Sequence, residues 1–169
     1  MDTASVRCSS KVPTPYLRRH WRLLVPHIGS RIPLALDLGC GNGRNTWFLR
    51  KQGFAVVPLD KEWGMHGRCV LGADALPVRD AVADAVIANY LFMFLDRAEC
   101  AHLCSEIRRV GRPGCRVMVE LYPSLRSYTP TEPEMLRLQD ALLQMLCPCS
   151  CLRHSRGRFV VEPKPGDAA

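Results

Sequence analysis

A glycine-rich turn and an aspartate further along the chain have the types and spacing that could do chemistry. Gly39, Gly41 and Gly43 alternate directly after one apolar run, and Asp60 ends the next apolar run, 21 residues after Gly39. Glycines at such positions let the backbone turn tightly and approach a ligand closely. The free N–H groups of a following helix face that ligand, and a carboxylate can accept hydrogen bonds from both hydroxyls of a ribose. The two features together predict a nucleoside-type ligand.

The spacing of the glycines separates two classes of nucleoside cofactor. Dinucleotide sites use G-x-G-x-x-G and place a pyrophosphate on the helix N-terminus. This chain has G-x-G-x-G, followed by Arg44. The missing third glycine favours a ligand without a pyrophosphate, and a dinucleotide oxidoreductase is a minor alternative.

Predicted strands and helices alternate along most of the chain. These elements position the glycine turn and Asp60. The apolar pattern predicts strands at 34–38, 54–59, 69–72 (weak), 83–89 and 115–121, and a closing hairpin of 147–153 and 158–162. It predicts helices from Thr14-Pro15 to Ile28 with Thr14 as the cap, over 45–52, over 100–110 and from 131–134 to 145, with a turn at 111–114. This order predicts an α/β fold with a doubly wound, Rossmann-like sheet, mostly parallel with a C-terminal antiparallel hairpin. Ligands bind outside the C-terminal ends of the strands in such sheets.

The segment from Leu36 to Arg44, LDLGCGNGR, resembles the first motif of class I S-adenosylmethionine-dependent methyltransferases. The resemblance covers about residues 34–121 and continues in order along the chain. Asp60 stands where the family holds the ribose, and residues 72–77 (GADALP) resemble the segment that contacts adenine. Residues 84–90 resemble the fourth strand, and residues 108–114 resemble the link before the fifth strand.

The resemblance implies S-adenosyl-L-methionine as the cofactor and assigns roles to the strand ends. The glycine turn, with Asp37, would take the methionine part, Asp60 the ribose, Asp74 and Ala75 the adenine, and Asn89 and Tyr90 the floor near the methyl group. Simpler interpretations are an orienting role for Asp37, a turn role for Asp74 and a cap for Asn89. The full predicted cofactor set is Asp37, Gly39, Cys40, Gly41, Asn42, Gly43, Asp60, Lys61, Asp74, Ala75, Asn89 and Tyr90.

Residues 41–62 are most similar to the tellurite-resistance type of methyltransferase, in which Arg-Asn also follows the motif and Asp-Lys also ends the second strand. Two features depart from other relatives. The stretch between Asp60 and Cys69 is short, and the fourth strand lacks the Asn/Asp-Pro-Pro-Tyr signature, which argues against the commonest DNA amino-methylases. The loop after the fifth strand is only about 12 residues long, so we expect no large substrate lid.

Methyl transfer needs a general base only where the acceptor carries a proton, so the catalytic residues are hard to predict. Tyr90, Glu120, Tyr122 and His66 are the weak candidates, and packing or solvation is the simpler role for each. Cys147, Cys149 and Cys151 alternate, but their C-x-C-x-C spacing differs from the usual C-x₂₋₄-C of zinc sites, so no metal is expected.

The bulk composition predicts one folded domain over residues 14–169 after a flexible lead of residues 1–13. No stretch resembles a signal peptide or a membrane span, so we expect a cytoplasmic protein whose nine cysteines are reduced. The net charge of +7 is concentrated at the ends, since residues 1–33 hold six basic residues and one acidic residue. A solvated basic surface is the simpler explanation, and nucleic acid or another anionic partner is the alternative.

Three functions therefore remain open. The first is methyl transfer to a small molecule or a metalloid oxyanion. The second is methylation of RNA or protein, guided by the basic N-terminal segment. The third is a non-catalytic cofactor-binding module or scaffold. The intact glycines, Asp60 and Asp74 argue against this third function. The sequence identifies neither the acceptor substrate nor the oligomeric state.

Overall fold

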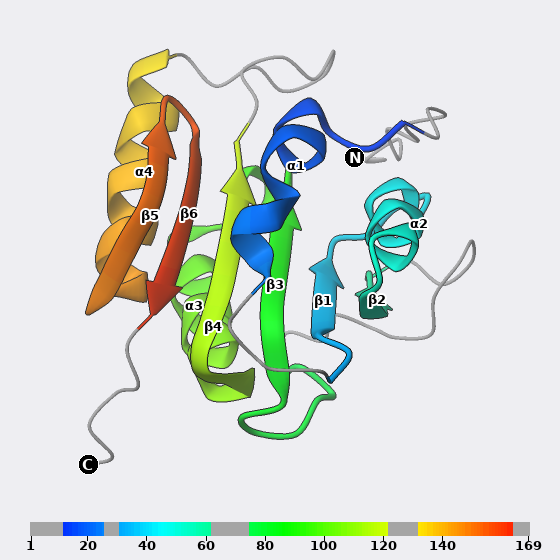
Figure 1. Cartoon of the computed structure of the whole chain (residues 1–169). Helices are drawn as coiled ribbons and strands as arrows, with labels where there is room; N and C mark the ends of the chain where they lie inside the picture. The colour runs from blue at the N-terminus through cyan, green and yellow to red at the C-terminus, as the bar shows by residue number, and fades with distance from the viewer. Residues whose placement is uncertain (1–11, 26–30, 62–74, 122–131, 164–169) are drawn as a thin grey trace.

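The computed structural model describes residues 12–25, 31–61, 75–121 and 132–163, which form one six-stranded sheet with helices on both faces (Figure 1). The elements in chain order are α1 (Pro15–His20), the 3₁₀ helix η1 (Trp21–Leu24), β1 (Leu34–Leu38), α2 (Arg44–Lys51), β2 (Ala55–Leu59), β3 (Ala83–Asn89), the 3₁₀ helix η2 (Phe92–Phe94), α3 (Arg97–Val110), β4 (Gly111–Glu120), α4 (Glu132–Leu146), β5 (Cys149–Ser155) and β6 (Arg158–Pro163). Within these ranges no helix combines the length and apolarity that crossing a bilayer requires.

The strand order is β2-β1-β3-β4-β6-β5. The pairs β1–β2, β1–β3 and β3–β4 are parallel, whereas β6 runs antiparallel to both β4 and β5. The chain winds outward from β1 in both directions, so the order switches between β1 and β3. The predicted doubly wound, Rossmann-like sheet with a C-terminal antiparallel hairpin is confirmed. The weak strand predicted at 69–72 lies outside the described residues.

Two apolar cores, one on each face, hold the sheet between its helices. Leu103 of α3 and Leu142 of α4 pack with one set of strand side chains. Leu17 of α1 and Leu49 of α2 pack with the other set, which includes Ile87 of β3. Successive strand residues point to opposite faces, which explains why β3 is buried along its whole length.

The N-terminal helix differs from its prediction. Only Pro15–His20 is α-helical, and the chain then tightens into η1. The guanidinium of Arg116 on β4 donates to the carbonyls of Leu23 and Val25, both at 3.0 Å, and so holds the chain against β4 where η1 ends. Ile28, the predicted end, lies outside the described residues. Thr14 precedes the helix as predicted, but its side chain makes no cap hydrogen bond.

The turn predicted at 111–114 is instead the first part of β4. Gly111 pairs with Ala83, and Arg116 pairs with Ala85, so the register shifts between them. Gly114, with a φ of 83°, lies in the bulge that absorbs the extra residues of β4. The glycines and the proline that suggested a turn therefore belong to an irregular, bulged part of β4.

Candidate active site

The glycine turn lies directly after β1 and is fastened to the end of β2. The N–H groups of Gly39 and Cys40 both donate to the carbonyl of Leu59, at 2.8 and 3.1 Å. Gly39, Gly41 and Gly43 have φ values of 67°, 50° and 73°, a region that side chains other than glycine rarely adopt. The alternating glycines are thus required by the backbone of this turn.

Asp60 joins the two features that the sequence separates by 21 residues. Its Oδ2 accepts a hydrogen bond from the N–H of Gly41 at 2.7 Å. A Cβ built on Gly41 would meet no atom within 4 Å, so the space beside this glycine is open. Asn42 accepts from the N–H of Arg44 at 3.3 Å and so orients the start of α2. Lys61 is exposed next to Asp60.

Asp37 lies beneath the turn, on the face covered by α2, and only 1% of its surface is exposed. Its Oδ2 accepts a hydrogen bond from the hydroxyl of Thr46 at 2.5 Å. Burial raises the pKa of this carboxyl to about 6, although the hydrogen bonds from Thr46 oppose the rise. Asp37 therefore connects β1 to the first turn of α2.

Cys40, within the turn, is a buried thiol whose pKa is raised to about 12, chiefly by burial and then by Asp37. A thiol with so high a pKa stays protonated and is a poor nucleophile at neutral pH. Its place in the turn is that of a small apolar side chain.

Tyr90 follows β3 with a φ of 64°, which is uncommon for a residue with a side chain. Its N–H donates to the carbonyl of Glu120 at 2.7 Å, and the guanidinium of Arg44 lies 5.5 Å from the centre of its ring. Burial, followed by the negative charge of Glu120, raises the pKa of the phenol above its usual value. Tyr90 thus links the glycine turn to the end of β4.

Glu120, the last residue of β4, is completely buried. Its Oε1 accepts from Nε of Arg158 at 3.1 Å, and the two residues are register partners on β4 and β6. The terminal hairpin therefore brings Arg158 against a predicted site residue.

Helix α1 lies over the ends of β3 and β4 (Figure 1). The amide of Asn89 donates to Oγ1 of Thr14 at 2.8 Å, and the N–H of Thr14 donates to Oδ1 of Asn45 at 3.1 Å. Tyr16 of α1 is buried beside these residues. Sequence reasoning missed Thr14, Tyr16 and Asn45 as site residues, since no local pattern predicts contacts over 75 positions.

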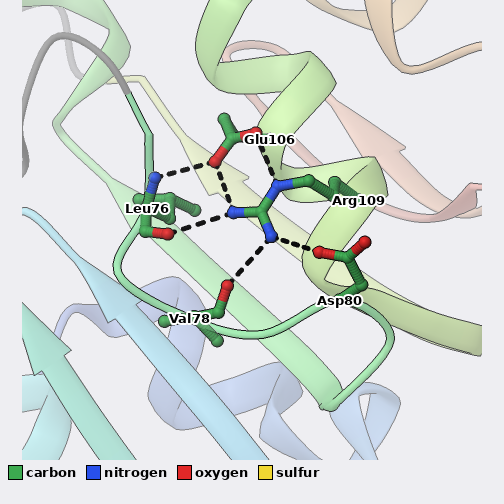
Figure 2. Close-up of polar contacts among 5 residues, drawn as sticks. All are labelled: Leu76, Val78, Asp80, Glu106 and Arg109. Atoms are coloured by element: carbon green, nitrogen blue, oxygen red, sulfur yellow. Dashed lines mark hydrogen bonds and ion pairs between the residues drawn. The ribbon is translucent and has the colours of Figure 1, made fainter.

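The segment resembling the adenine contact is anchored by an arginine on α3 (Figure 2). Arg109 donates to the carbonyls of Leu76 and Val78 at 3.0 and 2.9 Å and pairs with Asp80 and Glu106. Glu106 also accepts from the N–H of Leu76 at 2.7 Å. Ala75, the residue before Leu76, is exposed. This network fixes the backbone on one side of the predicted cofactor site.

Three predicted residues, Asp74, His66 and Tyr122, lie outside the described ranges. The thiols of Cys147 and Cys149 lie 3.6 Å apart, and neither they nor the thiol of Cys151 forms a disulfide bond. Among the residues that the structure describes, no group of three or more His, Cys, Asp or Glu side chains could hold a metal ion.

The turn, Asp60 and the ends of β3 and β4 thus meet at one edge of the sheet, as the sequence predicts for a nucleoside site. The family model described as a methyltransferase domain matches residues 36–119, the part of the chain from β1 through β4. The chain belongs to the class I S-adenosylmethionine-dependent methyltransferases. No curated protein sequence matches it.

Solved structures share the fold of this methyltransferase. A SAM-dependent methyltransferase from Aquifex aeolicus is 16% identical, with a TM-score of 0.62 over 88% of this chain and 92% of that chain. The 1,6-didemethyltoxoflavin-N1-methyltransferase from Burkholderia thailandensis, with bound 1,6-didemethyltoxoflavin and S-adenosylhomocysteine, is 19% identical, with a TM-score of 0.64 over 89% of this chain and 79% of that chain. A TehB-like methyltransferase from Corynebacterium glutamicum is 17% identical, with a TM-score of 0.61 over 86% of each chain. The narrower similarity to the tellurite-resistance type stays a prediction.

Proposed function

We propose that this methyltransferase binds S-adenosylmethionine across the glycine turn and Asp60 and transfers the methyl group to a small molecule at the ends of β3 and β4. The observation that carries the proposal is the hydrogen bond from the N–H of Gly41 to Asp60. This bond places the backbone of the glycine turn, which a ligand can approach closely, beside a carboxylate that can bind a ribose. The open space beside Gly41 is consistent with a ligand lying against the turn.

The residues present fit such a cofactor. A carboxylate has about four lone-pair sites, so Asp60 can accept from ribose hydroxyls as well as from the N–H of Gly41. The cofactor supplies an electrophilic methyl group on a sulfonium, whose sulfur keeps the bonding electron pair when the acceptor atom takes the methyl group. The chain has to position the two reactants and exclude water.

Among the residues that the structure describes, Glu120 supplies a carboxylate at the end of β4, where we place the methyl acceptor. Glu120 is fully buried next to Tyr90. The raised pKa of the Tyr90 phenol keeps Tyr90 protonated, so Tyr90 is unsuited to act as a base. Where the acceptor atom carries a proton, we assign Glu120 as the group that accepts it.

A small molecule is favoured over RNA or protein because the polar groups at the strand ends are buried. Thr14 and Tyr16 cover Asn89 and Glu120 and leave them little exposed surface. A few convergent polar groups within a mainly apolar surrounding are typical of sites for small ligands. A nucleic-acid or other anionic partner of the basic N-terminal segment remains a separate prediction.

Calorimetric titration with S-adenosylmethionine, and separately with NAD, tests the proposal. We expect S-adenosylmethionine to bind, and Asp60→Ala to weaken it by about 100-fold, because hydrogen bonds to a charged group contribute about 1.5–3 kcal/mol each. Asp140→Ala, which removes an exposed carboxylate on α4, is the matched control and should bind normally. Binding of NAD instead, or equal affinities for the two variants, would contradict the proposal.

A further inference from the structure

Buried polar atoms without partners gather at one end of the sheet. Among the described residues, five buried side-chain atoms have no hydrogen-bond partner. Three of them, the hydroxyl of Tyr16, Oδ1 of Asn89 and Oε2 of Glu120, belong to residues around the C-terminal ends of β3 and β4. These three residues are 7%, 6% and 0% exposed. We call them the polar cluster.

The three residues face the same side of the sheet. Asn89 and Glu120 are register partners on the parallel strands β3 and β4. Ile87 and Met118, two residues before each of them, pack in the core under α1 and α2, so Asn89 and Glu120 also point to that face. Tyr16 lies on α1, which covers this face.

Tyr16 packs in the same core cluster as Ile87 and Met118, which lie two residues before Asn89 and Glu120. The pKa of this phenol is raised mainly by burial, and the charges of Arg153, Glu120 and Arg158 also act on it. The amide of Asn89 donates to Thr14, two residues before Tyr16. The three unpartnered atoms thus belong to one neighbourhood.

A buried polar atom without a partner costs about 1–3 kcal/mol, and most such atoms in native proteins have a partner. We propose that the polar cluster binds the methyl acceptor, and that this acceptor is an uncharged small molecule with at least two N–H or O–H donors. The proposal rests on the proposed function, because it names the substrate class of the same site.

The chemistry of the three atoms selects this class. Oδ1 of Asn89 and Oε2 of Glu120 can only accept hydrogen bonds, whereas the hydroxyl of Tyr16 can do either. An oxyanion offers further acceptors and would face a carboxylate, so it fits poorly. An ammonium group also fits poorly, because Arg158 already pairs with Glu120 and Arg153 adds positive charge beside Tyr16.

Fragment binding observed by NMR tests the proposal with named probes. Catechol and isocytosine are uncharged and carry two or more donors. Veratrole is the dimethylated counterpart of catechol and carries none, and benzoate and tellurite are anions. Each probe is titrated into the protein alone and into the protein saturated with S-adenosylhomocysteine. We expect catechol or isocytosine to bind at least tenfold more tightly than veratrole, benzoate or tellurite.

Tyr16→Phe separates a ligand site from a structural hydrogen bond. The substitution removes a hydroxyl without a partner, so the melting temperature should stay the same or rise, while the affinity for the donor probe falls about fivefold or more. Glu120→Gln should weaken the probe similarly. Arg112→Lys is the matched control, since it removes an unpartnered buried Nε in the first part of β4, and it should leave probe binding unchanged.

Three results would overturn the inference. These are anions binding as well as the donor probes, no donor probe binding in either state, and a lower melting temperature of Tyr16→Phe with unchanged probe affinity. The proposed function fails separately, through the absence of S-adenosylmethionine binding in calorimetry. Probe binding to the protein alone tests the polar cluster even in that case.

Discussion

The glycine turn and the polar cluster lie at the same edge of one sheet, but they are assembled over different distances along the chain. The turn, residues 39–43, closes on Leu59 and Asp60, about 20 residues away, through backbone N–H groups. The polar cluster joins Tyr16, Asn89 and Glu120 through α1, β3 and β4. The first region is a local arrangement of backbone, and the second is an arrangement of side chains that exists only in the folded protein.

The difference suggests how the two halves of a methyltransferase site can vary. A cofactor shared by a whole family can be bound by backbone groups whose geometry depends on a few glycines. An acceptor that differs between relatives calls for side chains, which can be replaced without altering the turn. Substitutions in the two regions should therefore have different consequences.

The largest effect is expected on the acceptor side, at Gly157, which joins the terminal hairpin to β4. Its φ is 66°, and an added Cβ would lie 2.7 Å from Sδ of Met135 and 2.9 Å from the carbonyl oxygen of Leu121. We expect Gly157→Ala to lower the free energy of unfolding by about 4 kcal/mol, from overpacking and an unfavourable φ together. Urea unfolding measures this, and a loss below about 1 kcal/mol would show that the hairpin can shift freely.

A smaller effect is expected at Arg109, on the cofactor side. Arg109→Met would remove the ion-pair partner of Glu106, whose side chain is only 11% exposed. It would also remove the hydrogen bonds to the carbonyls of Leu76 and Val78. Breaking such a pair costs about 3 kcal/mol. The segment before β3 should then lose its fixed position, so S-adenosylmethionine should bind about tenfold more weakly.

Arg31→Met is the matched control for Arg109→Met. Arg31 pairs with Asp84 near the start of β3, at the opposite end of the strand from the site. Its loss should reduce stability without changing cofactor affinity. Equal losses of affinity in both variants would mean that Arg109 acts only through global stability.

The sequence predicted the cofactor side better than the acceptor side for a physical reason. The bounds of β1 and β3 agree with the prediction because strands buried on both faces are continuous apolar runs. The glycine turn follows directly after β1, and Asp60 follows directly after β2. In contrast, the hydrogen bond between Thr14 and Asn89 spans 75 positions, and no local pattern encodes it.

Two elements show how the same residues can serve different structures. Leu17, Trp21 and Leu24 have helical spacing, yet Arg116 binds the carbonyls of Leu23 and Val25 and the chain tightens into a 3₁₀ helix. Residues 111–114 have the composition of a turn but form a bulged strand, since their neighbours pair with β3. In both cases a distant partner decides the backbone conformation.

A third prediction concerns Asp37, where the turn meets α2. Its pKa is about 6 in the folded protein, above the ordinary value of 3.8, so the folded state binds the proton more tightly than the unfolded state. Stability therefore falls as the pH rises from about 4 to about 6, and the penalty of about 3 kcal/mol is complete above that range. Asp37→Asn removes this penalty but adds amide N–H groups that cost about 1 kcal/mol.

The net result for Asp37→Asn is a gain of about 2 kcal/mol at pH 8 that becomes a loss of about 1 kcal/mol near pH 3, where the wild-type carboxyl is protonated in both states. Thermal unfolding at the two pH values measures it. A gain that is the same at both values would mean that the carboxylate is not the source of the penalty.

The smallest change in stability, with the largest contrast in function, is expected at Gly41. An added Cβ meets no atom within 4 Å, so Gly41→Ala should cost only about 1 kcal/mol, from its φ of 50°. The same Cβ would extend into the space proposed for the cofactor, so S-adenosylmethionine should bind at least about tenfold more weakly. Gly41→Ala and Gly157→Ala make the same chemical change at two positive-φ glycines, one on each side of the site. If Gly41→Ala unfolds the protein or leaves cofactor affinity unchanged, the cofactor does not lie against the open side of the turn, and the division between a backbone-built half and a side-chain-built half fails.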